Sequence, residues 1–377
     1  MTEELQIKGT DYLKIAEQFA LNGNVTEAKV FGSGNINDTY LISLDTLDNR
    51  NFILQRINHY VFPQPQLVMQ NMRIFTEYAD QKLKNIHLDR RWEVPRVLLT
   101  KDGFDHYTDI DGSFWRAISF IQNSQSFDTI QNIEHSKEVG YALGMFHYLM
   151  GDLSPEQFAD TLPGFHITPT YLQQYEEVLP LHTNTNISEE VKYCLKFVSD
   201  RQKWANVLEN AKAENKLPLR LMHGDPKINN VMFDISTKKA VSVIDLDTIK
   251  PGLIHYDIGD CLRSACNPAG EEIEDWEAVY FDTDLSQGIL QGYLAVAQDF
   301  MTENDYLYIY DAIRLITFEL GLRFFTDYLA GNVYFKIKYP EHNLFRALVQ
   351  FKLAESIESQ AQTINRIIAD LQDCKIN

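Results

Sequence analysis

One polar segment constrains this chain more than any other feature of its sequence. The stretch LMHGDPKINN places His223, Asp225 and Asn230 in the order H-x-D-x4-N. A further carboxylate, Asp245, follows in the apolar, strand-like run VIDLD. A short hairpin that joins a loop to a strand can present such groups on one side. The chain must therefore fold so that these two segments lie next to each other.

The order and spacing are those of the residues with which protein kinases transfer phosphate. There, a loop Asp accepts the hydroxyl proton, an Asn holds one magnesium ion, and a later Asp holds the metal ion that bridges the phosphates. We therefore predict that Asp225 is the catalytic base. Asn230 and Asp245 are predicted magnesium ligands, because Mg²⁺ prefers hard oxygen donors. On a strand, Asp247 would share a face with Asp245 and would bind a second metal ion or orient Asp245.

Two neighbouring residues have structural interpretations. His223 precedes the predicted base by two positions, and we interpret it as a side chain that holds the loop backbone rather than as an acid or base. Asp257, in the stretch IHYDIGD, precedes a helical pattern and is typical of an N-cap. Bracing of the loop is a second role open to Asp257.

The 377 residues are too many for one compact core, which favours two domains. Short strand patterns, one helical pattern at 67–83 and glycine-containing turns fill residues 1–122, and helical patterns dominate 123–377. The predicted class is α+β, with a small β-rich N-lobe and a larger helical C-lobe that ends in one helix at 353–371.

The predicted N-lobe contains candidate residues for binding a nucleotide. Gly32, Ser33 and Gly34 lie between two predicted strands, as a loop covering phosphates would, although any hairpin also favours glycine there. The third strand, with the sequence NFILQRI, has no Lys. Arg56 is the predicted cation for the phosphates, with Gln55 as the alternative because only one of the two can face the ligand.

Glu77 lies on the helix that follows the third strand. This carboxylate either pairs with Arg56 in support of nucleotide binding or is an ordinary solvated helix residue.

The net charge, the N-terminal sequence and the spacing of the cysteines argue against several classes of protein. The 34 basic and 53 acidic residues give a net charge of −19, which disfavours binding to nucleic acid or to an anionic membrane. The N-terminus shows no signal-peptide pattern, and no apolar run approaches the ~20 residues of a membrane span. The four cysteines have neither zinc spacing nor a C-x-x-C pair. We expect a cytoplasmic protein, and no protein partner is implied.

The motifs HGDPKINN and VIDLD and the order of the lobes resemble the aminoglycoside phosphotransferase and choline kinase superfamily. Within it, HGDPKINNVMFD, IDLDTIKPGLIHYDIGDCLRS, FILQRIN and LPGFH are similar to the N-acetylhexosamine 1-kinases. The resemblance extends over most of the chain. It implies a two-lobed kinase fold, ATP and Mg²⁺ as cofactors, and transfer of phosphate to the anomeric hydroxyl of GlcNAc or GalNAc.

The same resemblance implies that Arg323 and Tyr334 contact the sugar together with Asp225. On composition alone, Arg323 would be a cation on a helix surface and Tyr334 a core aromatic. Two alternatives stay open. One is a kinase of another small alcohol, such as an aminoglycoside, choline, homoserine or methylthioribose. The other is a pseudokinase that binds a nucleotide as a scaffold, which the missing strand Lys would suit.

Overall fold

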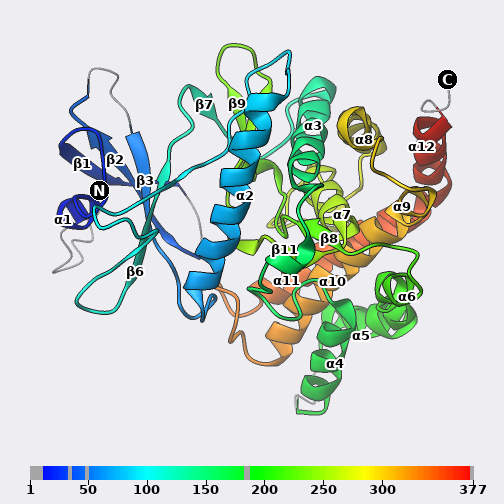
Figure 1. The fold of residues 1–377 in the computed structure, drawn as a ribbon. Helices are drawn as coiled ribbons and strands as arrows, with labels where there is room; N and C mark the ends of the chain where they lie inside the picture. The colour runs from blue at the N-terminus through cyan, green and yellow to red at the C-terminus, as the bar shows by residue number, and fades with distance from the viewer. Residues whose placement is uncertain (1–11, 33–35, 47–50, 182–186, 374–377) are drawn as a thin grey trace. The chain divides into compact units, whose positions relative to one another are not determined.

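The computed structural model describes residues 12–32, 36–46, 51–181 and 187–373. The chain divides into two compact units, Met1–Ser124 and Gln125–Asn377. Figure 1 colours the chain from blue, at the strands of the first unit, to red at the last helix of the second unit.

The described part of the first unit contains an antiparallel sheet in the order β1-β2-β3-β6-β4, with β5 paired to β6. Its helices are α1 and α2. The bounds are α1 (Tyr12–Ala16), β1 (Val25–Val30), β2 (Asp38–Leu44), β3 (Asn51–Arg56), α2 (Pro65–Asn85), β4 (Val97–Leu98), β5 (Tyr107–Thr108) and β6 (Phe114–Ser119).

Alternating burial gives the sheet one apolar face. Tyr40, Ile42 and Leu44 are buried on β2, while the residues between them are partly exposed. Phe52 and Leu54 repeat this alternation on β3. Because successive side chains of a strand point to opposite faces, these residues lie on one side of the sheet. They form a core cluster together with α1.

Helix α2 covers the other face of the sheet. Met72, Phe75 and Ala79 recur at helical spacing and are buried. On β6, Trp115 belongs to the core cluster of the first face, whereas the next residue, Arg116, places its Nη1 3.9 Å from the Met72 sulfur. The helix predicted for this part of the chain is confirmed.

The second unit is mainly helical in its described residues (Figure 1), and the short strands β8 and β9 flank the H-x-D-x4-N segment. Strand β9 pairs with β10 and strand β8 with β11, and the short strand β7 stands at the boundary of the two units. The bounds are β7 (Ser124–Gln125), α3 (Ile133–Met150), α4 (Thr168–Val178), α5 (Glu189–Arg201), α6 (Val207–Ala213), β8 (Arg220–Met222), β9 (Val231–Asp234), β10 (Ala240–Val243), β11 (Lys250–Gly252), α7 (Ile254–Ala265), α8 (Thr283–Ala297), α9 (Glu303–Leu307), α10 (Ile309–Leu329), α11 (His342–Ser359) and α12 (Ala361–Asp373).

Two helices of this unit approach so closely that only glycine fits between them. A Cβ on Gly140 of α3 would lie 1.8 Å from the carbonyl oxygen of Ile289 on α8. A Cβ on Gly292 of α8 would lie 1.8 Å from the carbonyl oxygen of Lys137 on α3. The glycines therefore set the distance between α3 and α8, and β10 packs against α3.

The single helix predicted at 353–371 is wrong. The structure has two helices there, because α11 ends at Ser359 and α12 begins at Ala361. Between them, the Gln360 side chain donates through Nε2 to the carbonyl oxygen of Phe281, 2.8 Å away. The apolar spacing continues across the break, so periodicity alone gives no signal for it.

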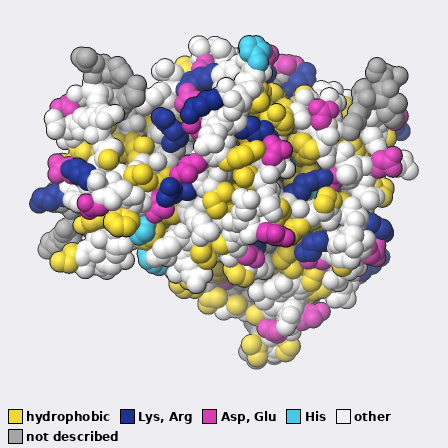
Figure 2. All heavy atoms as spheres, in the orientation of Figure 1, with side chains coloured by type: hydrophobic (Ala, Val, Ile, Leu, Met, Phe, Trp, Pro, Cys, Tyr) yellow, Lys and Arg dark blue, Asp and Glu magenta, His cyan; other side chains and the backbone are white. Residues whose placement is uncertain are grey.

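A β-rich first part followed by a larger helical part confirms the predicted α+β class. On the face drawn in Figure 2, basic side chains lie among acidic ones. Within the described ranges, the helices are too short or too polar to cross a membrane.

Candidate active site

Two loops of the second unit are brought side by side by strand pairing. The Asp225 loop (residues 223–230) connects β8 to β9, and the Asp245 loop (residues 244–249) connects β10 to β11. Because β8 pairs with β11 and β9 pairs with β10, both loops span the same two strand pairs. The backbone N–H of Ile244 donates to the carbonyl oxygen of Asn230 at 2.8 Å, which fixes one loop to the other.

Asp225 presents a reachable carboxylate within this arrangement. Its side chain is 31% exposed, and Oδ2 lies 2.9 Å from Nζ of Lys227. Burial disfavours the Lys227 charge, but attraction to Asp225 outweighs it and raises the pKa of the ammonium. Sequence reasoning missed Lys227, although its position two residues after the predicted base was a usable signal. The cation can hold the carboxylate in place or meet an anionic ligand beside it.

Asn230 is buried at the end of a short 3-10 turn, and the nitrogen of its side-chain amide is already hydrogen-bonded. Its Nδ2 donates to the carbonyl oxygen of Asp225 at 2.8 Å and lies 3.5 Å from Oδ2 of the same residue. The amide oxygen is therefore the end suited to a cation. This orientation fits the hard oxygen ligand that magnesium requires.

The strand predicted through Asp245 and Asp247 is wrong. Strand β10 ends at Val243, and a 3-10 turn covers Leu246–Thr248. Asp245 is exposed in the left-handed region, at φ 61° and ψ 60°, whereas Asp247 is only 3% exposed. The two carboxylates therefore do not share a face through strand alternation. A side chain in this region costs about 1–2 kcal/mol, and such strain concentrates at functional sites.

The side-chain oxygens of Asn230 and Asp245 are of the type that magnesium prefers. Asn230 offers an amide oxygen and Asp245 offers an exposed carboxylate from the neighbouring loop. Among the described residues there is no cluster of three His, Cys, Asp or Glu side chains of the kind that cages a metal ion. Magnesium bound by one or two protein carboxylates, phosphates and water needs no such cluster.

His223 holds the Asp225 loop through both ring nitrogens. Nε2 donates to the carbonyl oxygen of Ile244 at 2.9 Å, and Nδ1 accepts the backbone N–H of Asp225 at 3.2 Å. Burial lowers the pKa of this imidazole, which agrees with a neutral ring that donates once and accepts once. The side chain acts on loop shape, in line with its structural interpretation.

Asp257 braces the same loop and is not an N-cap. It lies inside α7, whose N-cap is Leu253. Its carboxylate accepts the backbone N–H of His223 at 2.6 Å and that of Gly224 at 2.8 Å. His147 on α3 contacts the same carboxylate through Nε2 at 2.9 Å. The cap interpretation is therefore wrong, and the bracing role is the one the structure shows.

Gly224 occupies a position that other residues would strain. Its φ is +88°, and a Cβ would lie 2.9 Å from the Cβ of Thr248 on the Asp245 loop. Glycine therefore allows both the turn before Asp225 and the close approach of the two loops.

The described nucleotide candidates of the first unit lie after β1 and on the following strands and helix. Gly32 is exposed at φ +77°, which suits a turn. Ser33 and Gly34 lie outside the described residues. Gln55 is partly buried on β3, where its Nε2 donates to the Thr39 hydroxyl at 3.0 Å.

Of the two alternatives for Glu77, the pair with Arg56 does not form, and the side chain is a solvated helix residue, 61% exposed. The Arg56 guanidinium donates through Nε to Oδ2 of Asp38 at 2.8 Å, and Glu77 accepts from Arg73 at 2.9 Å on the same helix. Arg56 pairs in register with Trp115 of β6, on the sheet face opposite α2. Strand alternation thus points Arg56 away from the helix that carries Glu77.

Sequence reasoning missed Arg116, which lies on the α2 side of the sheet. Its guanidinium donates to Oε1 of Gln55 through Nε at 3.0 Å and Nη2 at 2.7 Å, and the residue is 1% exposed. The apolar neighbours on both sides of it in the run FWRAI were the available signal. This buried cation stands beside Gln55, the alternative position for anchoring phosphates.

Arg323 and Tyr334 reverse the environments that composition alone suggests. The guanidinium of Arg323, on α10, lies 5.4 Å from the ring centre of Phe165, 4.8 Å from Tyr171 and 5.6 Å from Phe335. Burial disfavours its charge, but neighbouring Tyr171 and Glu319 raise the pKa of Arg323. Tyr334 is 55% exposed. Its backbone is held by Asp327, which accepts the Tyr334 N–H at 2.8 Å.

Arg323 is electrostatically linked to the surroundings of Asp225. Asp260 on α7 acts on the charge of Arg323 and also interacts with Lys227. Burial disfavours the charged carboxyl, but Arg263 and His166 hold the pKa of Asp260 below its ordinary value. Asp260 is thus a shared neighbour of the cation beside Asp225 and of the cation on α10.

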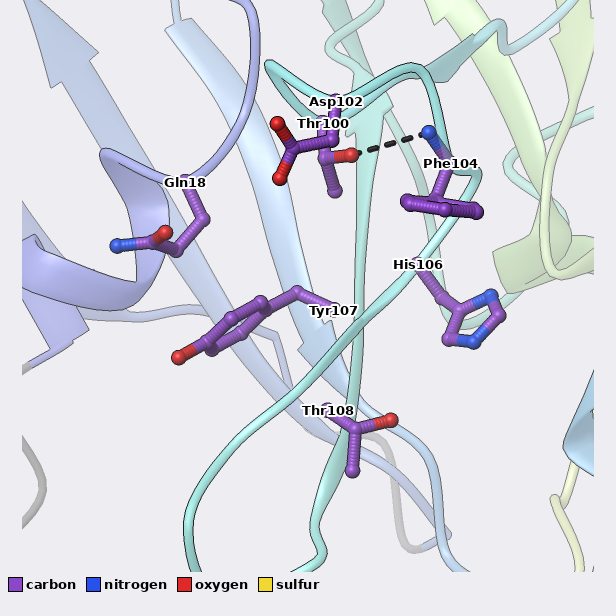
Figure 3. Close-up of a pocket in the computed structure, with 7 residues that line it drawn as sticks. All are labelled: Gln18, Thr100, Asp102, Phe104, His106, Tyr107 and Thr108. Carbon is purple, nitrogen blue, oxygen red and sulfur yellow. Dashed lines mark hydrogen bonds between the residues drawn. The ribbon is translucent and has the colours of Figure 1, made fainter.

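Two cavities of the molecule contain none of the predicted site residues. One, of about 270 Å³ in the first unit, is shown in Figure 3, where Phe104, His106 and Tyr107 extend from one stretch of chain. The other, of about 710 Å³, lies in the second unit and is lined by Lys203 and Arg314, among others. Neither cavity coincides with the two loops.

Comparisons with known proteins show the family and the fold of the chain. Residues 27–293 match the model of the phosphotransferase enzyme family, APH. An aminoglycoside phosphotransferase from Alicyclobacillus acidocaldarius has a similar structure, with 14% identity, a TM-score of 0.61 and coverage of 96% of this chain and 95% of that chain. A choline kinase from Cryptosporidium parvum gives 14% identity, a TM-score of 0.60 and coverage of 97% and 99%.

A third similar structure is the amicoumacin kinase hAmiN in complex with AMP-PNP, Ca²⁺ and Ami. It gives 13% identity, a TM-score of 0.54 and coverage of 96% of this chain and 92% of that chain. At these identities the likeness is one of fold. It confirms the predicted kinase-like fold, in which an antiparallel sheet precedes a helical region.

Proposed function

The chain belongs to the phosphotransferase enzyme family, and from this premise we propose that it is an ATP- and Mg²⁺-dependent sugar 1-kinase. The proposed acceptor is the anomeric hydroxyl of an N-acetylhexosamine, GlcNAc or GalNAc. The observation that carries the proposal is the side-by-side placement of the Asp225 and Asp245 loops, which supports one base and the metal ligands within one site.

In the proposed reaction, the acceptor oxygen attacks the γ-phosphorus of ATP as the bond to the β–γ bridging oxygen breaks, and ADP leaves. Asp225 orients the hydroxyl and takes its proton late in the transfer. Asn230 and Asp245 would hold Mg²⁺, which neutralises charge on the phosphates when bound. Asp247 is proposed as a further ligand or as a support for Asp245. Lys227, 2.9 Å from Asp225, keeps the base aligned.

We propose that residues 1–122 supply the nucleotide contacts and residues 123–377 the catalytic and acceptor contacts. In the first part, Gly32 and the β3 position at Gln55 or Arg56 are the proposed phosphate-binding groups. Glu77 would act there only by ordering Arg73, its partner in the structure.

The surroundings of Arg323 favour a neutral, hydroxyl-rich acceptor. Among the described residues, no carboxylate oxygen forms a salt bridge with its guanidinium, which faces the rings of Phe165, Tyr171 and Phe335. A guanidinium donates to sugar hydroxyls or an amide carbonyl and repels a cationic acceptor. Tyr334, which is 55% exposed and acts electrostatically on Arg323, is the proposed second sugar contact.

The test is release of ADP from ATP with Mg²⁺ in the presence of GlcNAc, GalNAc, glucose, choline, homoserine or kanamycin. We expect strong turnover on the two N-acetyl sugars and an anomeric phosphate signal in the ³¹P spectrum of the product. Omission of Mg²⁺ should abolish the signal. Arg323→Lys should raise the KM for the sugar, because a point charge replaces a planar fork of donors.

Other results would redirect the proposal. Turnover on choline, homoserine or kanamycin alone would contradict the sugar assignment while keeping the kinase reaction. ATP binding without Mg²⁺-dependent ADP release on any acceptor would favour a nucleotide-binding scaffold. Asp370→Asn controls for the general effect of changing a carboxylate of the second unit to an amide. Asp370 is an exposed residue on α12, which belongs to that unit.

A further inference from the structure

His166 is a buried histidine whose two ring nitrogens both contact acceptors. Nδ1 lies 3.0 Å from Oε1 of Glu319 on α10, and Nε2 lies 2.9 Å from the carbonyl oxygen of Gly224. The second carboxylate oxygen of Glu319 accepts the Thr168 hydroxyl at 2.6 Å. His166 itself has φ 62°, in the left-handed region, so its backbone is held in a costly conformation.

With Glu319 ionised, the contacts of His166 require both ring nitrogens to carry protons, because a carboxylate and a carbonyl can only accept. Burial opposes this charge, but Glu319 raises the pKa of the imidazole above its ordinary value. The titratable groups that face the ring are Glu319 from α10 and Asp260 and Tyr256 from α7. His166 and Glu319 thus form a buried ion pair.

Buried ion pairs contribute little net stability compared with apolar packing of the same volume. The position of this one suggests a different use. Gly224 immediately precedes Asp225, and its backbone is held on both sides: Asp257 accepts its N–H at 2.8 Å and His166 donates to its carbonyl. Rotation of the peptide that joins Gly224 to Asp225 would move Asp225.

The pair also reaches the helix of the proposed acceptor site. Glu319 and Arg323 lie four residues apart on α10 and therefore on one face, one turn apart. A continuous series of contacts runs from α10 through Glu319 and His166 to Gly224, next to Asp225.

We propose that His166 and Glu319 are positioning residues that fix the Asp225 loop relative to α10, so that the base meets a hydroxyl held at Arg323. The inference rests on the proposed function and adds to it two residues that align the base with the acceptor. A displacement of about 1 Å in a catalytic group can cost about 10²-fold in rate, so the alignment acts on kcat.

The test is a double-mutant cycle with amides in place of the charges. In His166→Gln, the new amide can still donate to Gly224, but its oxygen faces the Glu319 carboxylate. In Glu319→Gln, a neutral amide replaces the partner of the imidazolium. The double variant H166Q/E319Q can rebuild an uncharged chain, because the amide at position 319 can donate to the amide at position 166 and still accept from Thr168.

We expect kcat to fall about 10- to 100-fold in each single variant, with the acceptor KM changed less than about threefold. The kcat of the double variant should be about tenfold higher than that of the less active single variant. Such non-additivity is what coupled partners show. The pair exists while His166 is protonated and is lost as pH rises through its raised pKa. Wild-type kcat should therefore fall on the alkaline side, and the double variant should lack that limb.

His255→Gln is the matched control. His255 is also buried, 1% exposed, and its Nε2 contacts the backbone carbonyl oxygen of Asp305 at 3.0 Å, which belongs to α9 and to neither loop. It should lower the melting temperature and leave kcat unchanged. Normal kcat in both His166→Gln and Glu319→Gln, or strictly additive losses in the double variant, would overturn the positioning role.

A readout that needs no turnover separates this inference from the proposed function. In the full-length protein, hydrogen exchange of the Gly224 amide should accelerate in each single variant and slow again in the double variant. Unchanged exchange in the single variants would overturn the inference. If this exchange pattern is found and the wild-type protein phosphorylates no acceptor, the proposed function fails while the coupling stands.

Discussion

The Asp225 loop of the second unit and the strand pair β3–β6 of the first unit hold their polar residues in different ways. In the loop, charged side chains bind the backbone: Asp257 accepts the N–H groups of His223 and Gly224, and His166 donates to the Gly224 carbonyl. The bonds therefore fix the path of the chain itself. Side chains attached to this path, including Asp225, are placed with it.

In the sheet around the strand pair, polar side chains bind each other. Arg56 donates to Asp38 on β2, and Arg116 of β6 donates to Gln55 of β3. Which partners meet depends on which face of the sheet each residue occupies. The spacing of Asp225 and Asn230 therefore reflects a backbone path that side chains hold, whereas the partners of Arg56 and Gln55 are selected across a sheet and do not follow from spacing.

The largest expected effect is on the Asp225 loop itself. Asp225→Asn should lower turnover by about 10²–10⁴-fold, because the acceptor hydroxyl loses its base, while ATP binding is retained. ADP release and calorimetric titration with ATP measure the two properties. Near-normal turnover in this variant, beside an unaffected Asp370→Asn control, would remove Asp225 from the mechanism.

Loss of the brace should be the next largest effect. Asp257→Asn should lower the free energy of unfolding by about 3 kcal/mol, because a fully buried carboxylate that accepts two backbone N–H groups is replaced by an amide that presents a donor to one of them. Chemical denaturation provides the measurement. A change below about 1 kcal/mol would mean that other contacts hold the loop and that the loop and the sheet differ less than their bonds suggest.

The two arginines of the sheet offer a direct comparison of its faces. Arg116→Ala should destabilise the first unit by about 2 kcal/mol, since it leaves the Gln55 amide oxygen without its buried donor. Arg56→Ala should cost under about 1 kcal/mol, because its pair with Asp38 is exposed. Unfolding curves check both values, and equal losses would contradict the difference between the faces.

The same positions sharpen the assignment of the phosphate-binding group. If Arg56 meets the nucleotide, Arg56→Ala should raise the KM for ATP about tenfold, the equivalent of one charge-assisted hydrogen bond. Gln55→Ala is the companion variant for the other strand register. A rise confined to Gln55→Ala would move the assignment to the α2 side of the sheet, beside Arg116.

The smallest effect is expected at an exposed ion pair of the second unit. Hydrogen bonds and attraction from Lys338 and Arg346 lower the pKa of Glu272 to about 2. Since the folded pKa is depressed, the stabilisation is present above the ordinary carboxyl value and is lost as pH falls toward 2. Exposure of 42% limits it to under about 1 kcal/mol.

Denaturation of wild type and Glu272→Gln measures that contribution. The difference in unfolding free energy between the two should be largest near about pH 6 and should shrink as the pH is lowered below about 4. A difference independent of pH would assign the effect to packing of the side chain instead.

The kinase-like segment 223–247 could be predicted from the sequence. The spacing of Asp225, Asn230 and Asp245 is compatible with only a few backbone turns. The α+β class could be predicted from the sequence, because the period-2 pattern of a strand and the period-3.6 pattern of a helix each depend on residues within that one element. The break at Gln360 was not readable, since a side-chain bond to Phe281 from a distant segment accompanies it.

The class of fold, the order of its parts and the residues gathered at the Asp225 and Asp245 loops follow from the amino-acid sequence alone, because local periodicity and motif spacing are properties of neighbouring residues. The three-dimensional packing was needed to show that Asp245 lies outside a strand, that Arg56 contacts Asp38 rather than Glu77, and that His166 reaches Gly224. These outcomes depend on partners far apart in the chain, which packing selects and a linear pattern does not encode.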